Sequence, residues 1–132
     1  DGMGQLPFFN PDIEFEFNKV VEDYRLQLKT AKAVIIASPE YAHGVTGVMK
    51  NALDWVVGTG EFMQKTTVVL NCAHSATIAN NSIRETLSVM EAQVFPYSLP
   101  LRSHCTSVEQ ILADHTLNDQ LDDIATFLAT LC

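Results

Sequence analysis

A run of five apolar residues, Ala-Val-Ile-Ile-Ala at positions 33–37, constrains the fold of this chain more than any other stretch. Apolar and polar residues do not alternate in it, so a strand formed here is expected to be covered on both faces, as the central strands of parallel sheets are. Parallel strands need long crossover connections, which are usually helices. The run therefore predicts an α/β protein with a parallel sheet.

Helical patterns lie on both sides of this strand. Apolar residues recur at helical spacing in the segment that begins at Asn18, in residues 48–57 and in residues 117–131. In residues 48–57, apolar side chains cover most of the helix circumference and leave only a narrow polar stripe. One sheet cannot bury so wide an apolar surface, so this helix is expected to lie at a subunit interface. Burial between the sheet and neighbouring helices of the same chain is the alternative.

Further strands and helices follow the same alternation. Residues 66–71 and 93–97 are expected to be strands, and a short helix is expected at residues 107–113. Ser82 and Glu85 have the spacing of a capping box, which predicts the start of another helix. Strands alternating with helices favour a doubly wound parallel sheet in a single domain that spans the whole chain.

Charge and cysteine content narrow the classes of function. The chain has 16 acidic and 8 basic residues, and its formal net charge of −8 disfavours nucleic acid and anionic lipid as partners. Its apolar runs are far shorter than the roughly 20 residues that cross a bilayer. The three cysteines are widely spaced and form no C-x-x-C pair, which is typical of a reducing compartment. We therefore expect a cytoplasmic protein that binds neither nucleic acid nor membrane.

The segment that joins the first predicted strand to the next helix carries the candidate binding site. It reads Ser-Pro-Glu-Tyr-Ala-His-Gly-Val-Thr-Gly at residues 38–47. Pro39 ends the strand, while Gly44 and Gly47 let backbone amides approach a ligand without a Cβ in the way. A second loop of small residues, 72–77, follows the second strand. Because ligands bind at the carboxyl ends of parallel strands, both loops are expected to line one site.

The same segment resembles a motif of the NADPH-dependent FMN reductases, a family of flavodoxin-like fold that includes quinone, azo-dye and chromate reductases. The motif consists here of Ser-Pro-Glu-Tyr at 38–41, a Gly-containing spacer, and Gly-Val-Met-Lys-Asn-Ala-Leu-Asp-Trp at 47–55. Residues 6–7 and 10–14 are similar to the family's segment before its second helix, and residues 68–71 to its fourth strand. The resemblance implies a flavodoxin-like three-layer α/β/α domain.

The resemblance also implies an enzyme and its cofactor. Hydride would pass from NADPH, or NADH, through FMN to a flavin, a quinone or a similar small acceptor. The flavin carries the chemistry and the protein orients it, so neither a catalytic side chain nor a metal ion is expected. The first loop would support the flavin ring, with the second loop beside it. The expected cofactor-binding residues are Pro39, Glu40, Tyr41, Ala42, His43, Gly44, His74 and Ser75.

The chain departs from the family pattern at both loops and at its start. Ala42 stands where many members carry Asn, Thr46 replaces a common Pro, and the second loop lacks the expected Gly-rich run. Family members begin with a strand, a phosphate-binding loop, a helix and a second strand, which have no counterpart after Asp1. The chain is therefore expected to be N-terminally incomplete, retaining strands 3-4-5 of the sheet, with residues 33–37 as an apolar edge.

Other functions remain compatible with the sequence. The absent phosphate-binding loop and Ala42 favour a flavin-free truncated scaffold or oligomerisation module without catalysis. A flavodoxin-like electron carrier would bind FMN but would not oxidise NADPH. Family members commonly form dimers or tetramers, so the resemblance implies a homo-oligomer with the helix at residues 48–57 near the contact.

Individual side chains also keep two interpretations. Glu40 is either an acid catalyst or, more commonly, a carboxylate that holds the loop through backbone amides. Tyr41 either stacks near the flavin or pins the loop to a subunit interface. Arg84 and Arg102 either meet the phosphates of NADPH or are solvated surface charges. Trp55 is expected in the core or at an interface.

Overall fold

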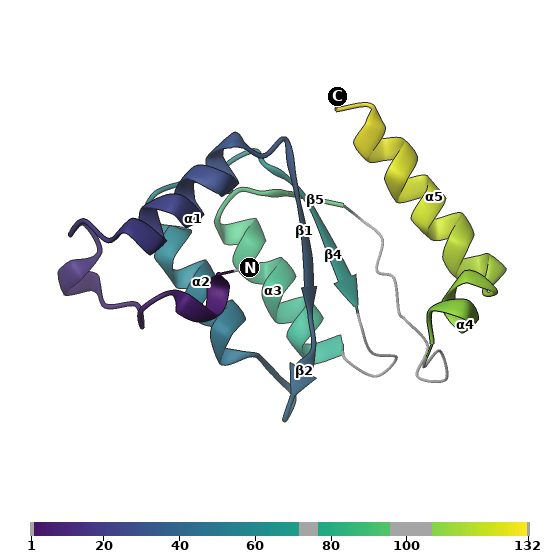
Figure 1. The fold of residues 1–132 in the computed structure, drawn as a ribbon, viewed down its shortest axis with the longest axis horizontal. Coiled ribbons are helices and arrows are strands. Elements are labelled where there is room, and N and C mark those ends of the chain that lie inside the picture. The colour runs from purple at the N-terminus through teal and green to yellow at the C-terminus, as the bar shows by residue number, and fades with distance from the viewer. Residues whose placement is uncertain (1, 72–76, 96–106, 132) are drawn as a thin grey trace.

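The structure is a computed structural model that describes residues 2–71, 77–95 and 107–131 (Figure 1). Helices and strands alternate along these segments, as the sequence predicts for an α/β protein. The helices are α1 (Lys19–Thr30), α2 (Gly47–Val57), α3 (Thr77–Val89), α4 (Val108–Leu112) and α5 (His115–Ala129), with two short 3-10 helices, η1 (Met3–Gln5) and η2 (Pro11–Ile13).

The described residues form a parallel sheet of three strands in the order β1-β4-β5. Strand β1 (Ala33–Ser38) pairs with β4 (Thr66–Asn71) along its whole length. Strand β4 also pairs with β5 (Gln93–Val94), while residues 96–97, which the sequence places in the same strand, lie outside the described residues. This order is the one expected for strands 3-4-5 of a flavodoxin-like sheet, and it leaves β1 at an edge.

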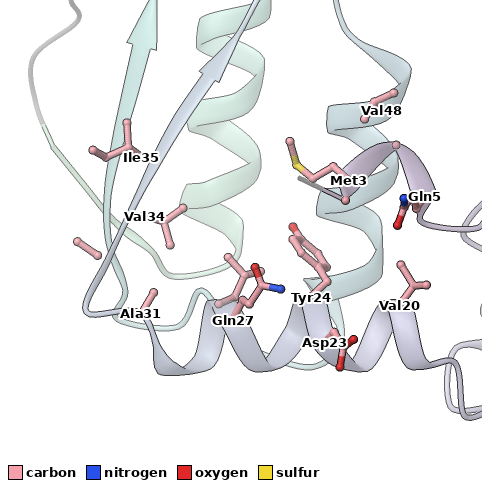
Figure 2. A pocket seen from close by; sticks show the side chains of 14 residues that line it. Met3, Gln5, Val20, Asp23, Tyr24, Gln27, Ala31, Val34, Ile35 and Val48 are labelled. Carbon is pink, nitrogen blue, oxygen red and sulfur yellow. The ribbon is translucent and has the colours of Figure 1, made fainter.

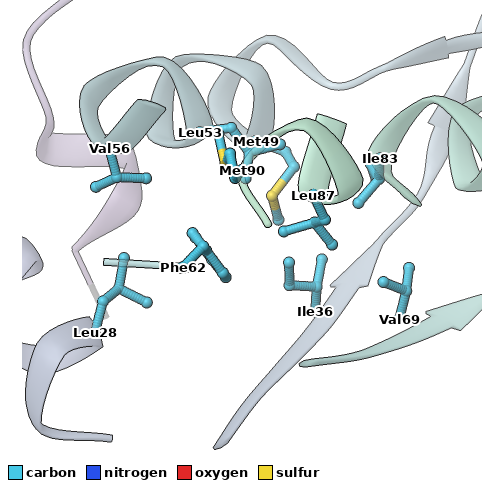
Figure 3. Packing of buried hydrophobic residues seen from close by; sticks show 10 residues of the cluster. All are labelled: Leu28, Ile36, Met49, Leu53, Val56, Phe62, Val69, Ile83, Leu87 and Met90. Atoms are coloured by element: carbon cyan, nitrogen blue, oxygen red, sulfur yellow. The ribbon is translucent and has the colours of Figure 1, made fainter. Parts of the chain in front are cut away.

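Helices cover both faces of the sheet, so the predicted three-layer fold is confirmed (Figure 1). On one face, Ile36 of β1 and Val69 of β4 pack against α1, α2 and α3 (Figure 3). On the other face, Val68 of β4 packs against Leu117 and Ile124 of α5. The larger cluster consists of Leu28, Ile36, Met49, Leu53, Val56, Phe62, Val69, Ile83, Leu87 and Met90.

Strand β1 is buried on one face only, so the prediction of a strand covered on both faces is wrong for this chain. Ile36 and Ser38 are buried, whereas Ile35 is 55% exposed. The apolar cluster on the second face lies on β4, and within the described residues it includes no residue of β1. A continuous apolar run indicates that a strand is buried but not how many neighbours cover it, and the predicted apolar edge is what the structure has.

Helix α2 is buried mainly by its own chain. Its first turn is capped by Thr46, whose Oγ1 accepts a hydrogen bond from the backbone N–H of Met49. Val48 and Val57 are about half exposed. The wide apolar surface that favoured a subunit contact is therefore mostly covered, and the contact itself stays a prediction. The buried residues of α2 are Met49, Ala52, Leu53, Trp55 and Val56.

The N-terminal segment, residues 2–13, packs against α2 through a small polar and aromatic network. The indole N–H of Trp55 donates to the backbone carbonyl of Pro7 (2.8 Å), to which the amide of Asn51 also donates (3.0 Å). The amide oxygen of Asn51 accepts from the backbone N–H of Phe9 (2.8 Å), and the Phe9 ring meets the Trp55 ring edge to face at 5.3 Å. Trp55 is thus a core residue, as one of its two interpretations stated.

Helix α3 begins at Thr77, five residues before the expected start, so the capping box at Ser82 is wrong. Ser82 lies inside the helix, where its backbone carbonyl accepts a hydrogen bond from the Thr86 hydroxyl. In the first turn of α3, the backbone N–H of Ala79 instead donates a hydrogen bond to the carboxylate of Glu40. Local sequence spacing does not reveal a partner so far away in the chain. Ile83, Leu87 and Met90 share the buried face, as predicted.

The C-terminal helices match their predicted positions. Ser107 and Gln110 form a capping box at the start of α4. Asp114 caps α5 by accepting a hydrogen bond from the backbone N–H of Leu117. Helix α5 then carries the apolar side chains that cover β4.

Candidate functional site

The segment after β1, which the sequence predicts to be a rigid loop, contains a small hairpin. Strand β2 (Glu40–Tyr41) pairs antiparallel with β3 (Gly44–Val45). The two residues between them, Ala42 and His43, have φ angles of 48° and 60°. Two consecutive positive φ angles are typical of a type I′ hairpin turn, which Asn-Gly or Asp-Gly usually occupies. Ala-His carries no such signal, which is why the sequence did not indicate the hairpin.

The tip of this hairpin is strained and open to solvent. A left-handed conformation costs a residue other than Gly roughly 1 kcal/mol or more, and Ala42 and His43 both adopt it. The Tyr41 residue is 71% exposed and the His43 side chain 79% exposed. The turn therefore presents an aromatic ring and an imidazole at the surface, held by the paired strands behind them.

Glu40 anchors the hairpin to α3. One carboxylate oxygen accepts a hydrogen bond from the backbone N–H of Ala79 at 2.7 Å, and the other lies 3.2 Å from Nδ1 of His43. Ala79 belongs to the first turn of α3, where the unpaired amides and the helix dipole favour a negative charge. The Glu40 side chain is only 9% exposed. The interpretation of Glu40 as a carboxylate that holds the loop through a backbone amide is therefore confirmed.

The candidate site lies where β1 and β4 end. Ser38 and Asn71 are partners in the register of the two strands, so the segments that follow them leave the sheet at the same edge. The bond from Glu40 to Ala79 then brings the hairpin beside the start of α3. Six of the eight predicted cofactor-binding residues, positions 39–44, are together in this hairpin and the residue before it. The other two, His74 and Ser75, lie outside the described residues.

The fold itself does not require glycine at the two positions that the sequence singled out. Neither Gly44 nor Gly47 has a positive φ angle. A Cβ at Gly47 would meet no atom within 4 Å, and one at Gly44 would meet only the backbone oxygen of Tyr41, at 3.4 Å. The space beside the backbone at Gly47, at the start of α2, is therefore open.

Arg84 is neither a solvated charge nor a free phosphate ligand, so both of its interpretations need correction. Its guanidinium donates to the backbone carbonyls of Phe95 (2.9 Å) and Val69 (3.3 Å) and to the side chain of Asn80 (2.9 Å). Burial lowers the pKa of the Arg84 side chain. It ties α3 to the central strand and to the residue after β5. Arg102 lies outside the described residues.

A cavity of about 780 Å³ lies away from the hairpin, along the free edge of β1 (Figure 2). Met3 of η1, Tyr24 of α1, Ile35 of β1 and Val48 of α2 are among the residues around it. Burial, with a smaller effect from the charge of Glu61, raises the pKa of Tyr24 to about 12. None of the predicted cofactor-binding residues at positions 39–44 lines this cavity, so it is separate from the hairpin.

The described part of the chain offers neither a metal site nor a membrane-spanning helix. Residues 2–71, 77–95 and 107–131 contain no group of three or more His, Cys, Asp or Glu side chains that could hold a metal ion. No helix within these segments has both the length and the apolar character needed to cross a membrane.

Known proteins similar to this chain are flavin and quinone reductases. The sequence profile of a family described as NADPH-dependent FMN reductase matches residues 2–104. An NAD(P)H-dependent FMN reductase of Pseudomonas aeruginosa is 32% identical over 101 residues, which are 72% of this chain and 54% of the relative. An NAD(P)H:quinone oxidoreductase of Solanum tuberosum is 44% identical over 55 residues, which are 40% of this chain and 28% of the relative.

A solved structure has a similar fold. FerB, a flavoenzyme NAD(P)H:(acceptor) oxidoreductase of Paracoccus denitrificans, superimposes with a TM-score of 0.73 over 98% of this chain and 74% of that one, at 19% identity. The chain spans 28% and 54% of the length of the two curated relatives. The profile match covers most of the chain and includes both halves of the motif at residues 38–41 and 47–55. The chain belongs to the NADPH-dependent FMN reductase family.

Proposed function

We propose that the protein is an NAD(P)H-dependent oxidoreductase that binds FMN and reduces a flavin, a quinone or a similar small acceptor. The observation that carries this proposal is the hairpin at the carboxyl end of β1, with its exposed tip and the open backbone at Gly47, in a chain of this family. The names of the two relatives, an FMN reductase and a quinone oxidoreductase, support the choice of acceptors.

The residues of the hairpin have properties that suit a flat aromatic ligand. Bound FMN supplies the capacity to take up hydride and pass reducing equivalents on, and the protein contributes binding and orientation. Tyr41 offers an exposed aromatic face, and Pro39, Ala42 and Gly44 offer backbone groups without bulky side chains. His43 lies at the tip. We also assign His74 and Ser75 to this site as its second loop.

We further propose that the protein works in the cytoplasm as a homo-oligomer. We assign the subunit contact to α2, on which Val48 and Val57 are the half-exposed apolar residues, one at each end of the helix and on opposite sides of it. Sedimentation or light scattering of the wild type and of a Val48→Lys, Val57→Lys double variant tests the contact, because two lysines at the interface should shift the protein to monomer.

The cofactor assignment is tested with the full-length protein. FMN is titrated while its fluorescence is followed, and NADPH oxidation is then measured with a quinone as acceptor. We expect quenching of the flavin and acceptor-dependent oxidation. A protein that leaves FMN fluorescence unchanged contradicts the proposal and favours a flavin-free scaffold. A protein that binds FMN but does not oxidise NADPH or NADH is an electron carrier.

The position of the site is tested by adding one methyl group. Gly47→Ala should leave the protein as stable as the wild type, or stabilise it by up to about 1 kcal/mol, because the methyl meets no neighbour and Ala favours helix. The same methyl should weaken FMN binding by about tenfold, since it occupies space that the ligand needs. Gly4→Ala is the matched control, because a Cβ at Gly4 also meets nothing within 4 Å and Gly4 lies outside the hairpin. Equal FMN affinity of Gly47→Ala and wild type would exclude this surface as the site.

A further inference from the structure

We infer that Glu40 is a positioning residue of the flavin site, which holds the hairpin of residues 40–45 against the first turn of α3. This inference rests on the proposed function, because it assigns a role within the same site. Glu40 does not act on the substrate. It acts through the backbone amide of Ala79, to which its carboxylate is bonded at 2.7 Å.

The contact is a long-range one between the hairpin that carries the candidate site and the start of α3. Glu40 and Ala79 are 39 positions apart in the sequence. Glu40 is the first residue of the hairpin that follows β1, and Ala79 lies in the first turn of α3, directly after the loop that follows β4. A displacement of either segment changes this distance, so the bond holds the hairpin and the start of α3 at one separation.

The chemistry of the bond makes it strong and specific. An ionised carboxylate that accepts a hydrogen bond from a helix N-terminal amide gains from both the charge and the helix dipole. The Glu40 side chain is nearly buried, so water competes little for it. Without Glu40, the N–H of Ala79 would lose its partner at a residue that is 2% exposed.

His43 restricts the carboxylate from the other side. Its Nδ1 lies 3.2 Å from the second oxygen of Glu40, so the carboxylate is held between the turn of its own hairpin and α3. The His43 side chain is largely exposed, whereas Glu40 is not. The hydrogen bond between Glu40 and Ala79 therefore holds the base of the hairpin, and the strained turn at Ala42 and His43 extends beyond this base.

The inference is tested in the full-length protein by four substitutions, two at Glu40 and two controls in α3. Glu40→Ala removes the acceptor, and Glu40→Gln keeps an acceptor oxygen without the charge. Glu85→Gln removes an exposed carboxylate from α3 and is the charge control. Ile83→Val mildly destabilises the buried face of α3 and is the stability control. FMN affinity is measured by fluorescence quenching, and amide hydrogen exchange in the first turn of α3 is measured without FMN.

We expect Glu40→Ala to weaken FMN binding at least about tenfold and to speed exchange of the Ala79 amide, because the hairpin is no longer held against the first turn of α3. Glu40→Gln should restore part of the affinity, and Glu85→Gln and Ile83→Val should bind FMN like the wild type. Wild-type affinity in Glu40→Ala overturns the inference, as does an equal loss in Ile83→Val, which would make the effect one of stability alone.

Failure of the proposed function has a different signature. A wild type that does not bind FMN overturns the proposed function and, with it, the flavin role of Glu40. The exchange measurement then still decides whether Glu40 joins the hairpin to α3. Unchanged exchange at Ala79 in Glu40→Ala overturns that link as well.

Discussion

The two irregular segments that flank α2 are held in opposite ways. The N-terminal segment, residues 2–13, is fastened to the helix by Trp55 and Asn51 through three hydrogen bonds and an aromatic contact. The hairpin of residues 40–45 is anchored at its base by Glu40 and keeps two strained residues at an exposed tip. A segment with several buried contacts contributes to stability, whereas a tip held only from its base remains open to a ligand.

The largest expected effect is a loss of stability when the contacts between residues 2–13 and α2 are removed. Trp55→Ala should lower the free energy of unfolding by about 3–5 kcal/mol, because it removes a buried indole, its bond to Pro7 and its contact with Phe9. Trp55→Phe should lower the free energy of unfolding by less, because an aromatic ring remains, although the hydrogen bond to Pro7 is lost. Urea unfolding followed by circular dichroism is the suitable measurement, because Trp55 is the single tryptophan. A loss below about 1 kcal/mol in Trp55→Ala would mean that the segment is not fastened in this way.

The second effect concerns Tyr24, which packs against the larger core cluster and against a smaller one of Leu6, Val21, Ala52 and Trp55. Burial raises the pKa of Tyr24 from 10.0 to about 12, so the folded protein keeps the phenol proton at a pH where the unfolded chain loses it. This contribution is complete below pH 10 and is lost as the pH rises from about 10 to about 12, by at most roughly 3 kcal/mol. Unfolding free energies of wild type and Tyr24→Phe across this range provide the measurement. Parallel pH profiles for the two proteins would contradict the burial of this phenol.

The smallest expected effect concerns the hairpin, where a substitution should increase stability instead of decreasing it. Ala42→Asn should raise the free energy of unfolding by about 0.5–1 kcal/mol, because Asn adopts a positive φ more readily than Ala. It should also strengthen FMN binding, since the family commonly has Asn here. Glu91→Asn is the matched control, because Glu91 has a φ angle of 58° at the end of α3, outside the site. A change in FMN affinity that is the same in both variants would show that turn strain, not the added amide, is responsible.

The sequence predicted the parts of the fold that depend on local patterns. The apolar run at residues 33–37 and the helical spacing from Asn18 and in residues 48–57 each correspond to an element, because side-chain periodicity follows from backbone geometry. The hairpin and the start of α3 were missed. Ala42 and His43 lack the usual turn residues, and the carboxylate at the first turn of α3 comes from Glu40, 39 positions away.

The sequence by itself determined the family, the α/β alternation and the six candidate residues at positions 39–44, because the motif and the apolar patterns are contiguous in the chain. Only the tertiary structure decided that Trp55 is covered by the N-terminal segment, that β1 is bare on one face and that Glu40 bonds to Ala79. Each of these depends on contacts between distant segments. A local pattern specifies which side of an element is apolar, but the rest of the fold decides what covers it.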